Sequence, residues 1–159
     1  MLSGRYQNKI DAKNRIILPA KLRNQIIKTY KHERPHMVIT LSFFNPCLVV
    51  MSEEQWEKLG NYDSVDFLNP VVTDSFRLMS MLAYVEMDDV GRITIPDYLQ
   101  EMVGISENVT ILGCRSYMEI WDPDRADQNL RELQERASEV MSKLRRELKG
   151  EKPEPGDTE

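Results

Sequence analysis

Hydrophobic and polar residues along this chain follow the same order twice. In each half a polar turn is followed by a short β-branched segment, Ile16–Leu18 and Ile93–Ile95. A proline then opens a segment with helical spacing, and Leu22, Ile26 and Tyr30 form its apolar stripe in the first half. Two apolar segments typical of strands close each half. The pattern therefore predicts the order β-turn-β-α-β-β, used twice.

The repeat is also visible residue by residue. Asp11–Leu22 and Asp88–Leu99 both fit D-x-x-N/G-R-I-x-L/I-P-x-x-L, at an offset of 77 residues. The later strand segments match in the same order, Met37–Leu41 with Asn108–Leu112 and Cys47–Met51 with Tyr117–Trp121. Each half is too small to bury a good core by itself. We therefore expect the two halves to pack together as a pseudo-dimer within one chain.

Helical segments join and follow the two halves. Ser52 and Gln55 have the spacing of a capping box, and Asn69-Pro70 predicts a helix to about Met81. Asp122-Pro123 predicts the longest helix, to about Lys149. Apolar residues recur there every three or four positions: Ala126, Leu130, Leu133, Ala137, Val140, Leu144 and Leu148.

These elements predict an α+β, β-rich fold with peripheral helices and a long C-terminal helix. The expected organisation has four parts: residues 1–81 as the first repeat with its linking helices, 82–122 as the second repeat, 123–149 as the amphipathic C-terminal helix and 150–159 as a disordered tail.

Net charge changes the picture once it is divided between the halves. The 159 residues carry a net charge of −5, which by itself argues against nucleic acid. Residues 1–31, however, hold eight cations and one acid, whereas the equivalent residues 78–108 hold one cation and six acids. A cluster of cations restricted to one half favours contact with phosphate through that half.

The cations of the first half gather around its turn. Four of them occupy odd positions, and on extended strands that parity would place their side chains on one face. Two more flank the start of the following helix, whose N-terminal amides favour phosphate. Arginine, and sometimes lysine or asparagine, also reads base edges. The predicted DNA-binding residues are Arg5, Lys9, Lys13, Asn14, Arg15, Lys21 and Arg23.

The turn itself has a structural interpretation. An Asp carboxylate accepts hydrogen bonds from turn amides, and Asn or Gly tolerates positive φ. Both halves keep the Asp and the Arg although only one half is basic. We therefore interpret Asp11, Asp88, Gly91 and Arg92 as residues that hold the fold.

Catalytic and metal-binding patterns are weak in this sequence. It contains neither G-x-x-x-x-G-K-S/T nor G-x-S-x-G. His32 and His36 are its two histidines, and Pro35 between them opposes the helix that would direct both to one metal. Cys47 and Cys114 adjoin apolar segments and are interpreted as small core residues. We predict no enzyme activity, no cofactor and no metal site.

The targeting signals are equally sparse. No apolar run approaches the length of a membrane span, and the N-terminal residues lack the apolar core of a secretory signal. A cytoplasmic location without a membrane partner is expected.

Several motifs over about residues 1–125 resemble the MraZ family of bacterial transcriptional regulators of the division and cell-wall gene cluster. They are DAKNRIILPAKLR, NPCLVVMSEEQW, the linking NPV, DDVGRITIPDYLQE and EIWD. The resemblance implies two AbrB-type swapped-hairpin motifs that form one β-barrel. It also implies a ring of subunits, commonly an octamer, which represses its own operon by binding G-rich direct repeats in double-stranded DNA and associates with the nucleoid. DNA contact would map onto Lys13, Asn14 and Arg15.

The sequence departs from the family pattern at three places. Asn14 stands where many members have Gly, Ser3 stands where a basic residue is common, and the second turn is unusually acidic. We therefore expect each subunit to contribute one basic turn, so that a ring engages successive repeats with several turns.

Two further functions compete with this one. The first is an antitoxin-like or scaffold module that binds a protein through the acidic half and the helix Ala126–Leu148, although a duplicated motif with a short tail argues against it. The second is a metal-dependent nucleic-acid enzyme.

Overall fold

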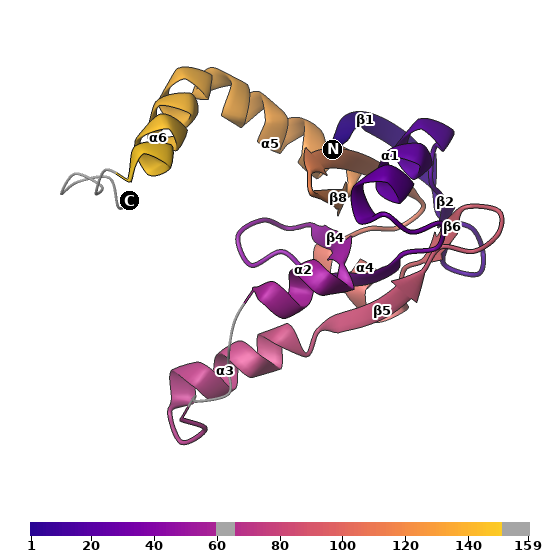
Figure 1. Cartoon of the computed structure of the whole chain (residues 1–159), viewed down its shortest axis with the longest axis horizontal. Coiled ribbons are helices and arrows are strands. Elements are labelled where there is room, and N and C mark those ends of the chain that lie inside the picture. Colours follow the sequence, from indigo (N-terminus) through magenta and orange to yellow (C-terminus); the bar gives the residue numbers. More distant parts are fainter. Residues whose placement is uncertain (60–65, 151–159) are drawn as a thin grey trace. The chain divides into compact units, whose positions relative to one another are not determined.

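A computed structural model of the chain describes residues 1–59 and 66–150 (Figure 1). These residues belong to two compact units, Met1–Pro123 and Asp124–Glu159, and the second is described as far as Gly150. The first unit mixes strands and helices, which confirms the predicted α+β class. The predicted boundary at residue 81 stays a prediction.

The element order of the first unit repeats as the sequence predicts. The first half contains β1 (Leu2–Lys9), β2 (Arg15–Ile17), α1 (Ala20–Tyr30), β3 (His36–Leu41) and β4 (Leu48–Ser52). The second contains β5 (Leu82–Glu86), β6 (Arg92–Thr94), α4 (Asp97–Val103), β7 (Asn108–Arg115) and β8 (Tyr117–Trp121). Two helices lie between the halves in sequence, α2 (Glu53–Lys58) and α3 (Pro70–Met79).

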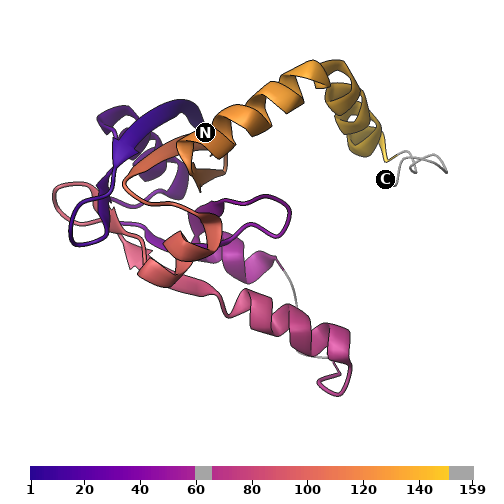
Figure 2. The same ribbon diagram turned by 180° about the vertical axis from the view of Figure 1, so that it is seen from behind.

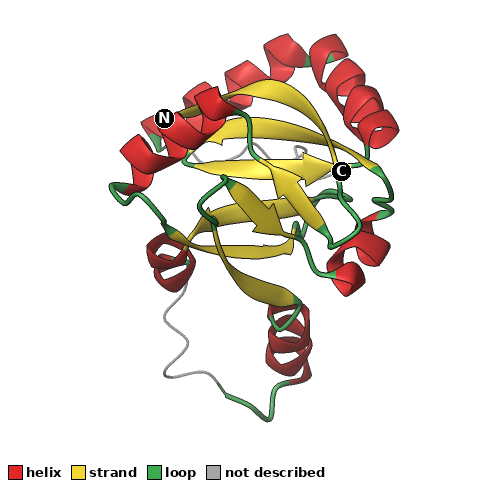
Figure 3. Ribbon diagram, turned by 90° about the vertical axis from the view of Figure 1, so that its right-hand side faces the viewer, coloured by secondary structure: helices red, strands yellow, loops and turns green. Residues whose placement is uncertain are grey.

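The strands of the two halves are interleaved in an antiparallel six-stranded sheet of order β1-β7-β8-β4-β3-β5. The first strand of each half pairs with the third strand of the other half, so that β1 pairs with β7 and β5 pairs with β3. Figure 3 shows the strands crossing the centre of this unit. Closure of the strands into a barrel stays a prediction.

The short strands β2 and β6 form a second, two-stranded sheet. Ile16 lies opposite Ile93, its equivalent in the repeat, so the pair marks a local pseudo-two-fold axis. Matching hydrogen bonds flank this axis: the N–H of Leu18 donates to the carbonyl of Gly91 at 2.9 Å, and that of Ile95 donates to the carbonyl of Asn14 at 2.7 Å.

The hydrophobic core draws equivalent residues from both halves. The apolar positions of the repeated motif are completely or almost completely buried: Ile16, Leu18 and Leu22, with their equivalents Ile93, Ile95 and Leu99. Burying one such side chain contributes roughly 1.5–3 kcal/mol. Because these side chains form one cluster, the two halves share a single hydrophobic core.

The linking helices begin at the residues that the sequence indicates. The N–H of Gln55 donates to Ser52 Oγ at 3.2 Å, and the N–H of Ser52 donates to Gln55 Oε1 at 3.1 Å, which confirms the capping box. Asn69 Oδ1 accepts from the N–H of Val71 at 3.0 Å and caps α3. α3 then leads into β5 (Figure 2).

The C-terminal region contains two helices where the apolar spacing predicts one. α5 (Pro123–Glu135) ends before Arg136, whose φ of −107° and ψ of 19° leave the helical range, and α6 (Ala137–Lys149) follows. No proline or glycine marks this break, so the residue types did not indicate it. The predicted disordered tail lies, from residue 151, outside the described residues. None of the described helices is long and apolar enough to cross a bilayer.

Candidate nucleic-acid interface

The turns before β2 and β6 share one hydrogen-bond framework. Asp11 Oδ1 accepts from the N–H groups of Lys13 and Arg15, both at 2.9 Å, and Asp11 Oδ2 accepts from Arg15 Nε at 2.8 Å. Asp88 binds the backbone of Val90 and Arg92 in the same way, with Arg92 Nε at 2.7 Å. Arg15, which the sequence assigned to DNA, therefore also braces its own turn.

These contacts favour the ionised carboxylates. The backbone N–H of Arg15, followed by its guanidinium, holds the pKa of Asp11 below its usual value, and Arg92 does the same for Asp88. A pKa that is lower in the folded state gives stability above the unfolded-state pKa, and this stability is lost as pH falls through the folded pKa.

We expect the double variant Asp11→Asn with Asp88→Asn to melt at a lower temperature than the wild type at pH 7. The difference should begin to shrink as the pH falls below the unfolded-state pKa of about 4 and should vanish below the lower pKa of the folded state, where the wild-type carboxylates are protonated in both states. Thermal unfolding followed by circular dichroism between pH 7 and 2.5 measures this. A difference in melting temperature that stays constant over that pH range would contradict the role assigned to these carboxylates.

The predicted cations occupy four places around the first turn. Arg5 and Lys9 are exposed on one face of β1, Lys13 is exposed in the turn, and Lys21 is exposed in the first turn of α1. Arg15 is half-buried on β2. Among the described residues, Lys13 and Lys21 form no ion pair, whereas Lys9 forms one with Glu107, with 3.8 Å between Nζ and Oε1.

We expected the alternation of side chains along extended strands to place Arg5, Lys9, Lys13 and Arg15 on one face. This expectation was wrong for the residues after β1. β1 and β2 belong to different sheets, and Asn14 between them has a φ of 61°. A residue in the left-handed region turns the chain and interrupts the period of two. Side-chain parity therefore relates Arg5 to Lys9 but does not extend to Arg15.

The helix that follows each turn differs between the halves. Both helices begin after a proline without a side-chain cap, but the first turn of α1 contains no acid, whereas the first turn of α4 contains Asp97. The uncapped amides at the start of α1 carry partial positive charge, and the exposed Lys21 adds to it.

Asn14 and Arg23, two of the predicted DNA-binding residues, have partners inside the protein. The side chain of Asn14 donates to Asp97 Oδ1 and accepts from Gln100 Nε2 at 3.1 Å. Arg23 Nη1 donates to the carbonyl of Val90 at 3.2 Å. Each side chain thus connects one turn to the other half of the unit.

Arg23 and Gln100 are equivalent positions of the repeat, 77 residues apart. Each packs over the turn of the opposite half, so the arrangement is symmetric although the residue types differ. Sequence reasoning missed Gln100, but applying the offset of 77 to Arg23 would have found it.

Arg23 also explains why the second turn contains Gly91. Gly91 has a φ of +85°, and a Cβ built there would lie 2.2 Å from Arg23 Cδ. We expect Gly91→Ala to lower the free energy of unfolding by about 1–2 kcal/mol from the positive φ alone, with the steric clash adding to this. In an Arg23→Ala background the same substitution should cost less, as measured by urea unfolding in a double-mutant cycle. Strict additivity of the two changes would contradict this packing.

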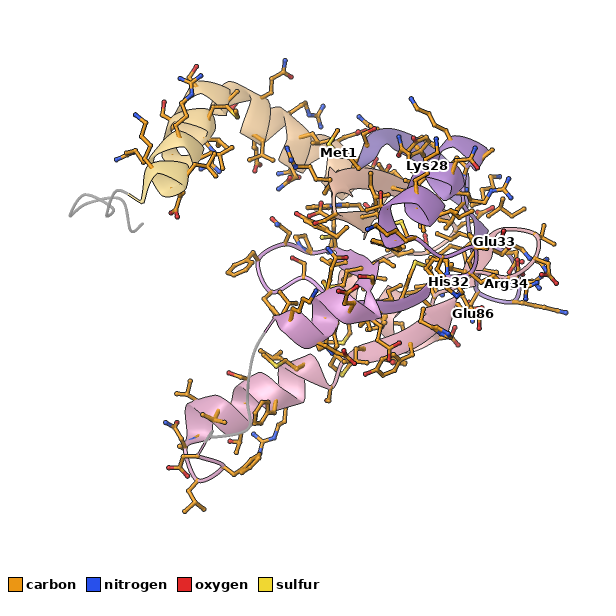
Figure 4. All side chains as sticks on the ribbon, viewed as in Figure 1. Met1, Lys28, His32, Glu33, Arg34 and Glu86 are labelled. Carbon is orange, nitrogen blue, oxygen red and sulfur yellow. The ribbon has the colours of Figure 1, made fainter. Side chains whose placement is uncertain are left out.

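The charge of the second turn is compensated locally. Arg34 forms an ion pair with Asp89, and Figure 4 labels Arg34 beside the projecting turns. Both turns project from the same side of the unit in Figures 1 and 2. Sequence reasoning missed Arg34 because it lies in the loop after α1, more than 50 residues from Asp89 along the chain. The two turns thus share a backbone framework but carry different charge.

His32 and His36 have ring centroids 6.3 Å apart, and within the described ranges no three His, Cys, Asp or Glu side chains gather as a possible metal site. Cys47 is buried, as predicted, whereas Cys114 is only partly buried. Burial raises the pKa of these thiols to about 12 and about 11, which disfavours the reactive thiolate.

Comparison with known proteins gives the same family that the motifs suggest. The family model described as "MraZ protein, putative antitoxin-like" matches residues 1–75 and 82–149 of the chain. The chain belongs to the MraZ family. The two matched ranges leave out only a short linking segment and the C-terminal residues.

Curated MraZ relatives cover most of the chain. A protein from Acetivibrio thermocellus is 33% identical over 127 residues, which is 79% of this chain and 83% of the relative. A protein from Treponema denticola is 30% identical over 90% of this chain and 96% of the relative. A protein from Lachnoclostridium phytofermentans is 31% identical over 91% of this chain and 97% of the relative. Each of these relatives is named "Transcriptional regulator MraZ".

Proposed function

We propose that this chain is a DNA-binding transcriptional regulator that contacts double-stranded DNA through its first turn. The observation that carries the proposal is the difference between two turns with the same framework. The first combines the exposed Lys13 with Lys21 at an uncapped helix start. The second contains two aspartates, one of them paired with Arg34, and precedes a helix that begins with an acid.

Within this surface the side chains take different parts. Lys13, Lys21, Arg5 and Lys9 neutralise phosphates, which gives affinity that falls as salt rises. Arg15 reads a base edge: Asp11 holds its Nε at 2.8 Å, and the fixed guanidinium directs its Nη groups as a fork that suits guanine. Asn14 and Arg23 support the turns rather than contact DNA.

We further propose that the first unit is an AbrB-type swapped-hairpin pseudo-dimer, because first strands pair across the halves. Copies assemble as a ring, octameric by the family resemblance, in which each subunit contributes one basic turn. Several turns then engage successive G-rich direct repeats upstream of the protein's own operon, and effective concentration strengthens the separate contacts. Bound there, the protein represses transcription, in the cytoplasm and on the nucleoid.

A binding titration tests this function. The wild-type protein is mixed with a labelled duplex from upstream of its own operon and with a scrambled duplex of the same composition, at several salt concentrations. We expect specific binding at least about 1,000-fold tighter than binding to the scrambled duplex at physiological salt. Equal affinity for both duplexes, or no binding at low salt, would refute the proposal.

A further inference from the structure

An apolar depression crosses the first unit away from the two turns. Two adjoining hollows, of about 340 and 610 Å³, share Phe43, Trp56 and Leu59 in their walls. The larger one is extended by Leu82 and Tyr84 of β5. We call these five residues the aromatic groove. Tyr84 is 64% exposed and Leu59 60% exposed, and exposed apolar residues that lie together around one depression are typical of a contact surface.

The second unit presents an apolar stripe on α6. Met141, Leu144 and Leu148 follow one another at intervals of three and four residues, which places them on one side of the helix. They are 48%, 45% and 79% exposed. α6 has 13 residues, and a helix of that length is marginal in water without a surface to pack on.

The groove and the stripe also have complementary charge. Glu57 and Glu119 lie among the residues that line the two hollows. α6 contains four cations and two acids, and Arg145 and Lys149 flank the apolar stripe. Opposite charges at the rim of an apolar contact steer association and fix its register.

We propose that α6 of one copy docks in the aromatic groove of a second copy. The contact is a helix-in-groove arrangement with Met141, Leu144 and Leu148 as anchors. Helix and groove are different surfaces, so contacts passed in one direction from copy to copy are heterologous, and they close into a ring when the rotation between neighbours completes a full circle. The inference rests on the proposed self-association and names the surfaces that produce it.

Two substitutions on α6 test the proposal through the mass of the assembly. Leu144→Glu places a charge in the stripe, whereas Ser142→Glu places the same charge on the opposite side of the helix. We expect Leu144→Glu to raise the dissociation constant between copies by at least about 30-fold, as for a central interface anchor. Ser142→Glu should leave it unchanged. Light scattering over a dilution series measures both. Equal effects of the two variants would overturn the proposal.

A cross-linking experiment identifies the occupant directly. A benzophenone side chain replaces Leu148 in ¹⁵N-labelled protein, which is mixed with unlabelled wild type and irradiated. We expect cross-links from labelled α6 to unlabelled peptides that contain Phe43, Trp56 or Tyr84. Cross-links within one chain, between two copies of α6, or to a foreign protein that co-purifies would each overturn it. A monomeric wild type would refute the ring as well, whereas a stable ring that lacks the expected cross-links would refute only this contact.

Discussion

Reversing two charges at the first turn, Lys13→Glu with Lys21→Glu, is expected to abolish specific DNA binding at physiological salt. Both side chains are exposed and form no ion pair among the described residues, so their loss removes favourable charge without breaking an internal contact. Each lost phosphate contact should lower the slope of log affinity against log salt by about 1, and the new acids add repulsion. We expect affinity to fall at least about 100-fold with the melting temperature unchanged.

The matched control changes the same number of charges elsewhere on the first half. Lys28→Glu with Lys31→Glu alters the C-terminal end of α1, away from the turn. Lys28 is labelled in Figure 4. We expect this control to retain most of the binding, as measured by fluorescence anisotropy with the upstream duplex. If both double variants lose affinity equally, net charge rather than the first turn drives the binding.

Removing the arginine of either turn should lower stability equally but affect DNA binding unequally. Arg15 Nε and Arg92 Nε make the same contact with their aspartates, at 2.8 and 2.7 Å, and the two side chains are buried to similar extents. We therefore expect the melting temperatures of Arg15→Ala and Arg92→Ala to lie within about 3 °C of each other. Specific DNA binding should be lost only in Arg15→Ala.

The sequence assigns Arg15 to DNA and Arg92 to the fold, whereas the structure gives both arginines the same contact with an aspartate. Differential scanning calorimetry gives the melting temperatures, and anisotropy titrations are made well below both of them. Arg15→Lys adds a third comparison, because lysine keeps the charge but not the bidentate fork. If Arg92→Ala removes DNA binding and Arg15→Ala does not, the roles of the two halves are reversed.

Much of the fold could be predicted because the two halves share many residue types within short motifs in the same order. Ile16 and Ile93, which are 77 residues apart, lie opposite each other across β2 and β6. The same offset relates the equivalent Arg–Asp hydrogen bonds of the two turns. The same offset relates Arg23 to Gln100, so the residue that contacts one turn identifies the equivalent residue that contacts the other.

Other features depend on tertiary structure that no local pattern reveals. The side-chain parity of β1 does not reach Arg15, because Asn14 adopts positive φ and the chain enters another sheet. The pair Arg34–Asp89 joins two loops that are distant in sequence. The break at Arg136 falls in a segment whose apolar spacing continues without interruption.

Photo-cross-linking from equivalent positions of the two turns tests the central claim most directly. Ala12 and Asp89 are both exposed, are 77 residues apart, and precede Lys13 and Val90. A benzophenone side chain at one position or the other is irradiated with the upstream duplex, at protein concentrations that saturate the DNA. The account predicts that position 12 cross-links to the DNA and position 89 does not. Equal cross-linking from both positions, or cross-linking from position 89 alone, would contradict it.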